Sequence, residues 1–183
     1  ERREFRNFRK AAVADTKSVL KIYAPYVDHT AITFETEIPT EEEFAHRITQ
    51  TLQRYPYLIA EENGVILGYA YATAYKIRAA YDWTAEVTVY IDREVKAKGI
   101  GTMLYHHLES ELKKQNIVNL TACITAGNES SVRFHQKFGY KEVAYFPQIG
   151  YKFEQWHDVL WMQKELQQFD GDVPKFIPYP LTQ

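Results

Sequence analysis

The sequence predicts an α+β fold in which helices flank one mixed central sheet. Apolar and polar side chains alternate over 84–91, which is typical of a strand with one buried face. Leucine recurs every four residues over 104–112, which indicates a helix. An Asn-Gly pair at 63–64 separates two β-prone runs and favours a tight hairpin. The chain has 183 residues, so we expect a single domain over 1–183.

The expected order of elements is strand, two helices, three strands, helix, strand, helix and two strands. Asp15 is a candidate N-cap for the first helix, and Thr40-x-x-Glu43 forms a capping box for the second. The stretch 31–34 between these helices is short and β-prone. The expected strands are 8–13, 57–61, 65–75, 84–91, 118–125, 143–146 and 151–162, and the later helices are 101–115 and 128–138.

Composition limits the classes of partner. The formal net charge is −2, so broad attraction to nucleic acid or to an anionic membrane is not expected. No apolar run reaches the length of a membrane span, and no signal peptide is recognised. The single cysteine, Cys123, cannot form an intrachain disulfide and suits a reducing cytoplasm. Its apolar neighbours predict a core position, and no spacing of histidine or cysteine predicts a metal site.

The stretch 95–102 joins the 84–91 strand to the next helix through two glycines. The first N–H groups of a helix lack intrahelical partners and carry partial positive charge, which favours an anion such as pyrophosphate. Lys96 and Lys98 would add cations. A plain tight connection explains the glycines equally well. The pattern is neither a P-loop, which ends in Gly-Lys-Ser/Thr, nor the three-glycine dinucleotide fingerprint.

Lys96-x-x-Gly99-x-Gly101 resembles the Arg/Gln-x-x-Gly-x-Gly/Ala loop of the GNAT superfamily of N-acetyltransferases, which binds the pyrophosphate of acetyl-CoA. Lys96 departs from the usual Arg or Gln and lacks their planar donor pair. The stretches 80–86, 131–135 and 156–159 resemble the phosphinothricin and methionine sulfoximine acetyltransferases. The resemblance covers nearly the whole chain and implies the GNAT fold and no metal. The acetyl-CoA site that it implies comprises Val89, Tyr90, Ile91, Lys96, Ala97, Lys98, Gly99, Ile100, Gly101, Thr102 and Asn128.

Glu86 is the first candidate catalytic residue. In a strand it shares a face with Thr88 and Tyr90, while Ala85 and Val87 face the core. A carboxylate in the middle of a strand lines a cleft, faces water at an edge, or forms an ion pair. The resemblance implies the first, with Glu86 as the general base for the acceptor amine.

His135 is the second candidate, on the helix that starts near Asn128. A lone helical histidine is most often a surface or hydrogen-bonded core residue. The resemblance implies a catalytic role, either as proton donor to coenzyme A or as partner of Glu86, and histidine titrates near neutrality. Asn128 is a candidate contact to coenzyme A and also a candidate N-cap, and the two roles are compatible.

The implied acceptor site contains both cations and aromatic side chains. Exposed loop cations are ordinarily only solvated, but the resemblance assigns them to the acidic groups of an amino-acid substrate. An arginine presents a planar fork to such an acid. The implied residues are Phe34, Lys76, Arg78, Tyr81 and Tyr90.

The expected function is acetyl transfer from acetyl-CoA to the α-amine of a small glutamate-like amino acid, such as phosphinothricin, methionine sulfoximine or methionine sulfone. The alternatives are acetylation of another amine, including a peptide N-terminus, and non-catalytic binding of an acyl-CoA. The resemblance also implies a homodimer. The Pro-rich tail over 171–183 should be extended, and its apolar side chains should cover either this protomer's own sheet or a second copy.

Overall fold

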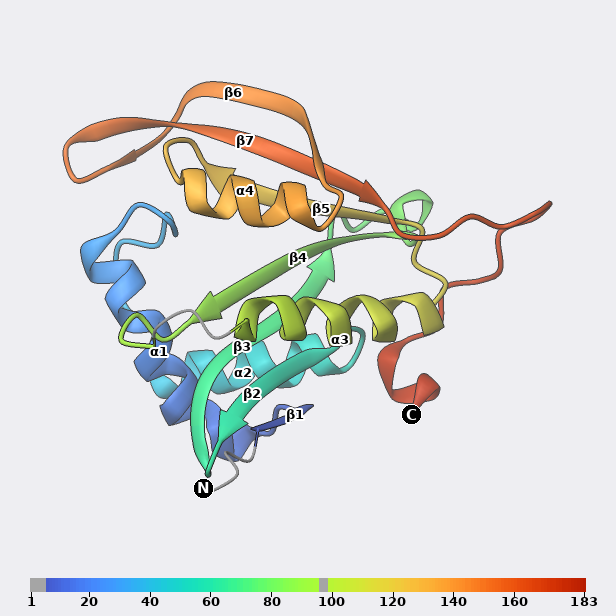
Figure 1. Cartoon of the computed structure of the whole chain (residues 1–183), viewed down its shortest axis with the longest axis horizontal. Coiled ribbons are helices and arrows are strands. Elements are labelled where there is room, and N and C mark those ends of the chain that lie inside the picture. The colour runs from blue at the N-terminus through green and yellow to red at the C-terminus, as the bar shows by residue number, and fades with distance from the viewer. Residues whose placement is uncertain (1–5, 96–98) are drawn as a thin grey trace.

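The computed structural model describes residues 6–95 and 99–183. Its order of strands and helices is the predicted one, and the expected α+β arrangement of helices around one mixed sheet is confirmed (Figure 1). The strands are β1 Arg6–Lys10, β2 Tyr57–Glu62, β3 Val65–Ala74, β4 Thr84–Ile91, β5 Asn119–Thr125, β6 Lys141–Lys152 and β7 Gln155–Glu165. The helices are α1 Thr16–His29, α2 Glu41–Leu52, α3 Ile100–Lys114 and α4 Glu129–Lys137. No helix within these ranges is long and apolar enough to cross a membrane.

Several local predictions are confirmed and others are wrong. The Thr40–Glu43 capping box is present in both directions. Asp15 occupies the N-cap position of α1, but its carboxylate bonds to Arg9 and to the Ala12 amide rather than capping the helix. The stretch 31–34 forms bends rather than a strand. The last hairpin turns at 153–154, where both residues have positive φ, so β6 is much longer than the expected 143–146.

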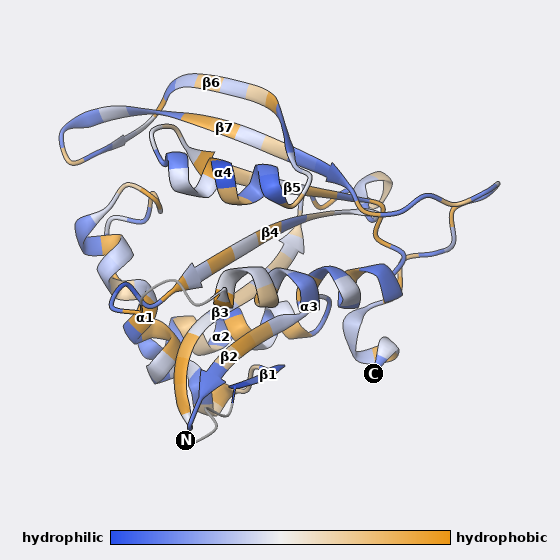
Figure 2. Ribbon diagram, viewed as in Figure 1, coloured by the Kyte–Doolittle hydropathy of each residue, from blue (hydrophilic) through white to orange (hydrophobic). Residues whose placement is uncertain are grey.

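Helices cover both faces of the β1–β4 part of the sheet. α1 and α2 pack on one face, which carries Tyr57, Tyr69 and Tyr90, and α3 packs on the other, which carries Ala85 and Val87. Figure 2 shows hydrophobic stretches along β2 and β3, where the helices cover them. β4 therefore has one face in each core, as the alternation in its sequence predicted.

The seven strands are ordered β1-β2-β3-β4-β5-β7-β6, and β4–β5 is the parallel pair. Only three residue pairs join these two strands, from Thr84–Asn119 to Glu86–Thr121. Beyond them the strands diverge (Figure 1). The residues of β4 after Glu86 therefore face an opening on their β5 side, and the site lies in that opening.

The Pro-rich tail covers its own protomer. The ring of Phe176 packs on Tyr55 with centroids 5.6 Å apart, and Tyr179 is buried. Gln115 donates one amide hydrogen bond to the Ile177 carbonyl at 2.9 Å. The tail is extended as far as a short 3₁₀ turn at Tyr179–Thr182. Of the two surfaces expected for it, this protomer's own is the one observed.

Candidate functional site

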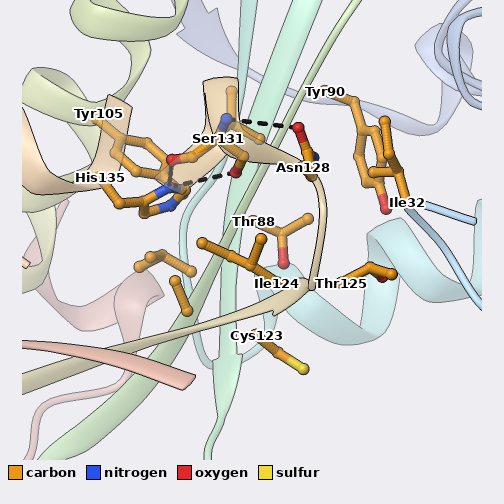
Figure 3. A pocket seen from close by; sticks show the side chains of 13 residues that line it. Ile32, Thr88, Tyr90, Tyr105, Cys123, Ile124, Thr125, Asn128, Ser131 and His135 are labelled. Carbon is orange, nitrogen blue, oxygen red and sulfur yellow. Dashed lines mark hydrogen bonds between the residues drawn. The ribbon is translucent and has the colours of Figure 1, made fainter. Parts of the chain in front are cut away.

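Two adjoining cavities occupy the opening between β4 and β5. The larger has a volume of about 490 Å³ and reaches the N-terminus of α3, and the smaller, about 70 Å³, lies deeper beside α4. They share five lining residues, so they form one continuous channel. The shared residues are Ile32, Val89, Tyr90, Asn128 and Ser131. Figure 3 shows the smaller cavity, with Tyr105 and His135 at one end and Tyr90 at the other.

The N-terminus of α3 lies on the wall of the larger cavity. Gly99 is its N-cap at φ +70°, a left-handed conformation that glycine adopts without steric cost, and no side chain caps the helix. A Cβ at Gly101 would meet the Phe134 ring at 3.5 Å, so larger side chains there would crowd the cavity. The first-turn amides are therefore available to an anion. Lys96, Ala97 and Lys98 lie outside the described residues.

The predicted cofactor-binding residues that are described come together here. Val89, Tyr90, Ile91, Gly99, Ile100, Gly101, Thr102 and Asn128 all line the larger cavity. Asn128 also caps α4 by accepting a hydrogen bond from the Ser131 amide, so its structural role is observed. Helix N-terminal amides at one end and a long open strand edge beside them fit the pyrophosphate and the amide-bearing arm of acetyl-CoA.

Glu86 lies where the β4–β5 pairing ends, on the α1 and α2 face of the sheet. It lines neither cavity, and Thr88, two residues further along the same face, lines the smaller one. Within 6–95 and 99–183 its carboxylate has no hydrogen bond or ion pair, and it is half-buried. Burial raises the pKa of the Glu86 carboxyl above its ordinary value. A half-buried carboxylate whose oxygens are free is suited to accept a proton.

His135 is buried on α4, on the opposite side of the opening. Its Nδ1 lies 2.7 Å from the Ser131 carbonyl, which can only accept, so Nδ1 carries the hydrogen. Nε2 then accepts a hydrogen bond of 2.9 Å from the Tyr105 hydroxyl. Burial lowers the pKa of His135, and the imidazole is neutral at pH 7. The structure thus places His135 in the channel but with both nitrogens occupied.

The prediction of a core position for Cys123 is wrong. The thiol side chain is exposed in the smaller cavity because β5 has lost its β4 neighbour at this point. Crowding by protein atoms, together with the charge of Glu86, raises the pKa of Cys123 to about 11. The thiol is therefore protonated at neutral pH and is a poor nucleophile.

The predicted acceptor residues are dispersed. Tyr90 lines the channel, whereas Phe34 packs across Gly150 on β6, where a Cβ would approach its ring to 2.2 Å. Lys76, Arg78 and Tyr81 are exposed in the connection between β3 and β4 and line neither cavity of the channel. The ring of Tyr81 packs against Tyr75, which in turn contacts Trp161 on β7.

Several lining residues were not predicted. Tyr26, Ile32, Ser131 and Phe134 line the larger cavity, and Tyr105 joins the smaller one from α3. Ser131 lies one helical turn before His135, so the i,i+4 spacing could have indicated its contact. Tyr105 is 30 residues from His135 and carries no such signal. No group of three potential metal ligands is found among the described residues.

Comparison with known proteins gives a consistent match along the chain. The family model described as an acetyltransferase (GNAT) domain matches residues 8–161. The chain is 37% identical over 175 residues to a phosphinothricin N-acetyltransferase of Streptomyces viridochromogenes, covering 96% of this chain and 94% of the relative. It is 33% identical to an L-methionine sulfoximine/L-methionine sulfone acetyltransferase of Salmonella typhimurium, over 86% of this chain and 93% of that protein.

One solved structure is similar over almost its whole length. It is a GNAT superfamily phosphinothricin acetyltransferase from Sinorhizobium meliloti, crystallised in complex with acetyl-CoA. The TM-score is 0.86 at 30% sequence identity, and the superposition covers 95% of this chain and 98% of the other.

Proposed function

The chain belongs to the GNAT acetyltransferase family, and on that premise we propose that it transfers the acetyl group of acetyl-CoA to the α-amine of a small amino acid. The proposed acceptors are glutamate-like compounds: phosphinothricin, methionine sulfoximine and methionine sulfone. The relatives that carry these names support the substrate class. The observation that carries the proposal is the channel that begins at the α3 N-terminus and ends near Glu86.

Glu86 is proposed to accept the proton that the amine loses. An α-amine with a pKa near 8 is about one-tenth neutral at pH 7. A carboxylate with a raised pKa and free oxygens therefore needs to contribute only a small part of the deprotonation. Alignment of the amine with the thioester then supplies much of the rate. The protonated Cys123 supports direct attack by the amine rather than transfer through the enzyme's thiol.

His135 is proposed to act on the coenzyme A side, as the proton donor to the leaving thiolate. Its location across the opening from Glu86 favours this role over direct partnership with Glu86. Because Ser131 and Tyr105 are bonded to the two ring nitrogens, one of these hydrogen bonds must break before that nitrogen can pass a proton to the thiolate.

Lys76, Arg78 and Tyr81, with Phe34 and Tyr90, are proposed to contact the acceptor. A screen of amine acceptors by thiol release tests the proposal. We expect turnover with methionine sulfone, methionine sulfoximine or phosphinothricin, and Arg78→Ala should raise KM for acidic acceptors while leaving acetyl-CoA binding unchanged. Equal loss for acidic and neutral acceptors would remove Arg78 from the specificity role, and coenzyme binding with no turnover on any amine would refute the enzyme assignment.

We further propose a two-fold homodimer and a cytoplasmic location. Exposed apolar side chains on the β6–β7 hairpin support self-association; they are Val143, Tyr145, Ile149, Tyr151, Phe153 and Trp156. The tail has its own intramolecular surface, so we expect a chain that ends at Asp170 to remain dimeric in light scattering if it stays folded. A full-length monomer at micromolar concentration would contradict the dimer. With phosphinothricin as acceptor, herbicide resistance would follow from the activity.

A further inference from the structure

The seam between β4 and β5 contains a buried hydroxyl group that has no partner. Thr121 of β5 is 6% exposed, and its Oγ1 forms no hydrogen bond with any residue that the structure describes. The other buried side-chain atom of this kind within 6–95 and 99–183 is Oε1 of Gln115, but the amide nitrogen of Gln115 donates to two carbonyls. A buried hydroxyl without a partner is unfavourable, because it has lost its bonds to water and gained none in return.

Thr121 lies directly beside the proposed base. It is paired with Glu86 in the last of the three pairs that join β4 to β5, and neighbouring strands lie about 4.8 Å apart. The preceding pair, Ala85 and Leu120, belongs to the core under α3. Because successive side chains alternate between the two faces of a sheet, Glu86 and Thr121 both point to the opposite face.

The carboxylate of Glu86 and the hydroxyl of Thr121 complement each other. Both lack a hydrogen-bond partner among the described residues. The negative charge of Glu86 is felt on this face of β5, since it raises the pKa of Cys123, two residues beyond Thr121. The glutamate side chain has three rotatable bonds and the threonine hydroxyl turns about one, so a change of rotamer joins an unpaired donor to an unpaired acceptor.

The neighbour of Thr121 on the other side is engaged elsewhere. Gln163 of β7 lies opposite Thr121 in the antiparallel register. Its side chain is exposed, and its Nε2 donates to Oδ1 of Asn119 at 3.3 Å. Glu86 is therefore the register neighbour whose acceptor atoms are both free and partly buried.

A donor at this position offsets the effect of burial on the base. Burial is the cause of the raised pKa of Glu86 within the described part of the chain. A hydrogen bond to an ionised carboxylate is about twice as strong as one between neutral groups, and it favours the ionised form. A carboxylate has about four lone-pair sites, so one bond from Thr121 leaves the other oxygen available to an amine.

We propose that Thr121 is a positioning residue for the transfer: its hydroxyl donates a hydrogen bond to the ionised carboxylate of Glu86 and directs the second oxygen of that carboxylate to the acceptor amine. The inference rests on the proposed function, in which Glu86 takes the proton of the amine. Thr121 lines neither cavity of the channel, so it acts through Glu86 and not on a substrate.

The other titratable groups around Glu86 keep their charge state near neutral pH. Tyr71 of β3 and Cys123 of β5 interact with Glu86, and burial raises the pKa of both, that of Cys123 to about 11. The ionisable residues of the neighbouring elements are Tyr23 on α1, Arg47 on α2, which is paired with Glu35, and Lys76 and Arg78 after β3. His135, across the opening, titrates on the acid side, so the pKa must be measured on Glu86 itself.

A carboxyl ¹³C NMR titration measures the pKa of Glu86, and the signal is assigned by its absence in Glu86→Gln. Thr121→Val keeps the shape of the side chain and removes the hydroxyl. We expect it to raise the pKa of Glu86 by about one unit and to lower kcat at pH 7 about three- to tenfold, with KM for acetyl-CoA unchanged. Thr121→Ser keeps the donor and should restore both values. Thr121→Ala removes the same hydroxyl and replaces the valine variant if that variant does not fold.

Thr73→Val is the matched control. Thr73 pairs with Glu86 from the β3 side and is half-buried, so water can satisfy its hydroxyl. This variant should keep the wild-type pKa of Glu86 and the wild-type kcat.

Urea denaturation gives a second measurement. If the hydroxyl of Thr121 had no partner, Thr121→Val would be more stable than wild type at every pH. The proposed bond exists only with ionised Glu86, so we expect Thr121→Val to be less stable than wild type above the pKa of Glu86, and this difference to vanish as the pH falls through that pKa.

The role of Thr121 and the enzyme assignment fail in different experiments. An unchanged pKa of Glu86 in Thr121→Val, or an equal shift in Thr73→Val, would overturn the role of Thr121 and leave the acetyltransferase proposal intact. Coenzyme binding with no turnover of any amine would refute the enzyme assignment. The titration needs no acceptor, so it would still support or overturn the hydrogen bond.

Discussion

Glu86 and His135 flank the same opening in the sheet but are held in opposite ways. Glu86 has no hydrogen-bond partner among the described residues, and its pKa is raised by burial. His135 has both nitrogens engaged, by Ser131 and Tyr105, and its pKa is lowered by burial. Burial therefore moves both groups towards their neutral forms, but only Glu86 keeps its lone pairs free. The difference agrees with the proposed roles, in which Glu86 accepts the proton of the amine and His135 is held in one orientation by its two hydrogen bonds.

Replacement of Glu86 should produce the largest effect. We expect Glu86→Gln to lower kcat by about 10²- to 10⁴-fold, because the amide keeps the shape but cannot accept the proton. Raising the pH should recover part of the activity as more of the amine becomes neutral. The wild-type rate should fall as the pH drops through the raised pKa of Glu86, since the base must be ionised.

The control for this variant is Glu111→Gln, which changes a carboxylate on α3 that pairs with Lys114. It should leave steady-state kinetics unchanged. Full activity of Glu86→Gln at neutral pH would show that the two sides of the opening do not differ in the proposed way.

Replacement of His135 should cost less. We expect His135→Ala to reduce kcat by about tenfold, because water can reach the leaving thiolate in the space that the imidazole vacates. Tyr105→Phe, which removes only the donor to Nε2, should raise the pKa of His135 in an NMR titration, since that bond favours the neutral ring. A loss of kcat for His135→Ala as large as that for Glu86→Gln would contradict the proposed difference between the roles of the two residues.

The smallest expected effect is on stability at acid pH. The folded-state pKa of His135 is lowered below the unfolded value of about 6.5, so the unfolded chain binds more protons between the two values. The stabilisation is present above about pH 6.5 and is lost as the pH falls towards the folded pKa, by up to about 1.4 kcal/mol per pH unit. Urea denaturation of wild type and His135→Gln between pH 7 and pH 5 measures it.

His46, which is exposed on α2, supplies the matched variant for this measurement. The slope of unfolding free energy against pH in His46→Gln gives the reference for a histidine replaced at the surface. The same slope in His135→Gln would mean that other groups cause the acid sensitivity.

Local signals in the sequence were enough to predict the order of the fold. The predicted limits of the 84–91 strand are those of β4, and the capping box at Thr40 starts α2 as expected. The predictions of secondary structure were wrong where packing between distant residues determines the backbone conformation. The bends at 31–34 arise where Thr33 and Phe34 contact other elements, through Tyr23 and Gly150. The Tyr23 contact crosses ten residues and the Gly150 contact comes from far along the chain, so no local propensity reveals them.

The same limit applies to the site. Gly99 and Gly101 of the loop that resembles the GNAT pattern could be predicted from the sequence, as could Asn128, and all three line the larger cavity of the channel. The bond from Tyr105 to His135 joins two helices, and the pairing of Thr121 with Glu86 depends on the β4–β5 register. Such contacts require the three-dimensional arrangement. The cations at 76 and 78 remain predictions from resemblance.

The short seam between β4 and β5 also has a mechanical meaning. Three residue pairs hold the two parts of the sheet together at one end, and the chain reinforces that end: the Trp83 indole donates to the Pro174 carbonyl at 2.7 Å, and the Leu166 amide bonds to Val118. The two strands are therefore joined at the end near the tail and separated at the end that faces the larger cavity. The separation between β4 and β5 is fixed by hydrogen bonds at the paired end and by none of these three pairs at the open end. Glu86, which belongs to the last of the three pairs, therefore lies where the separation of the two strands is most strongly fixed.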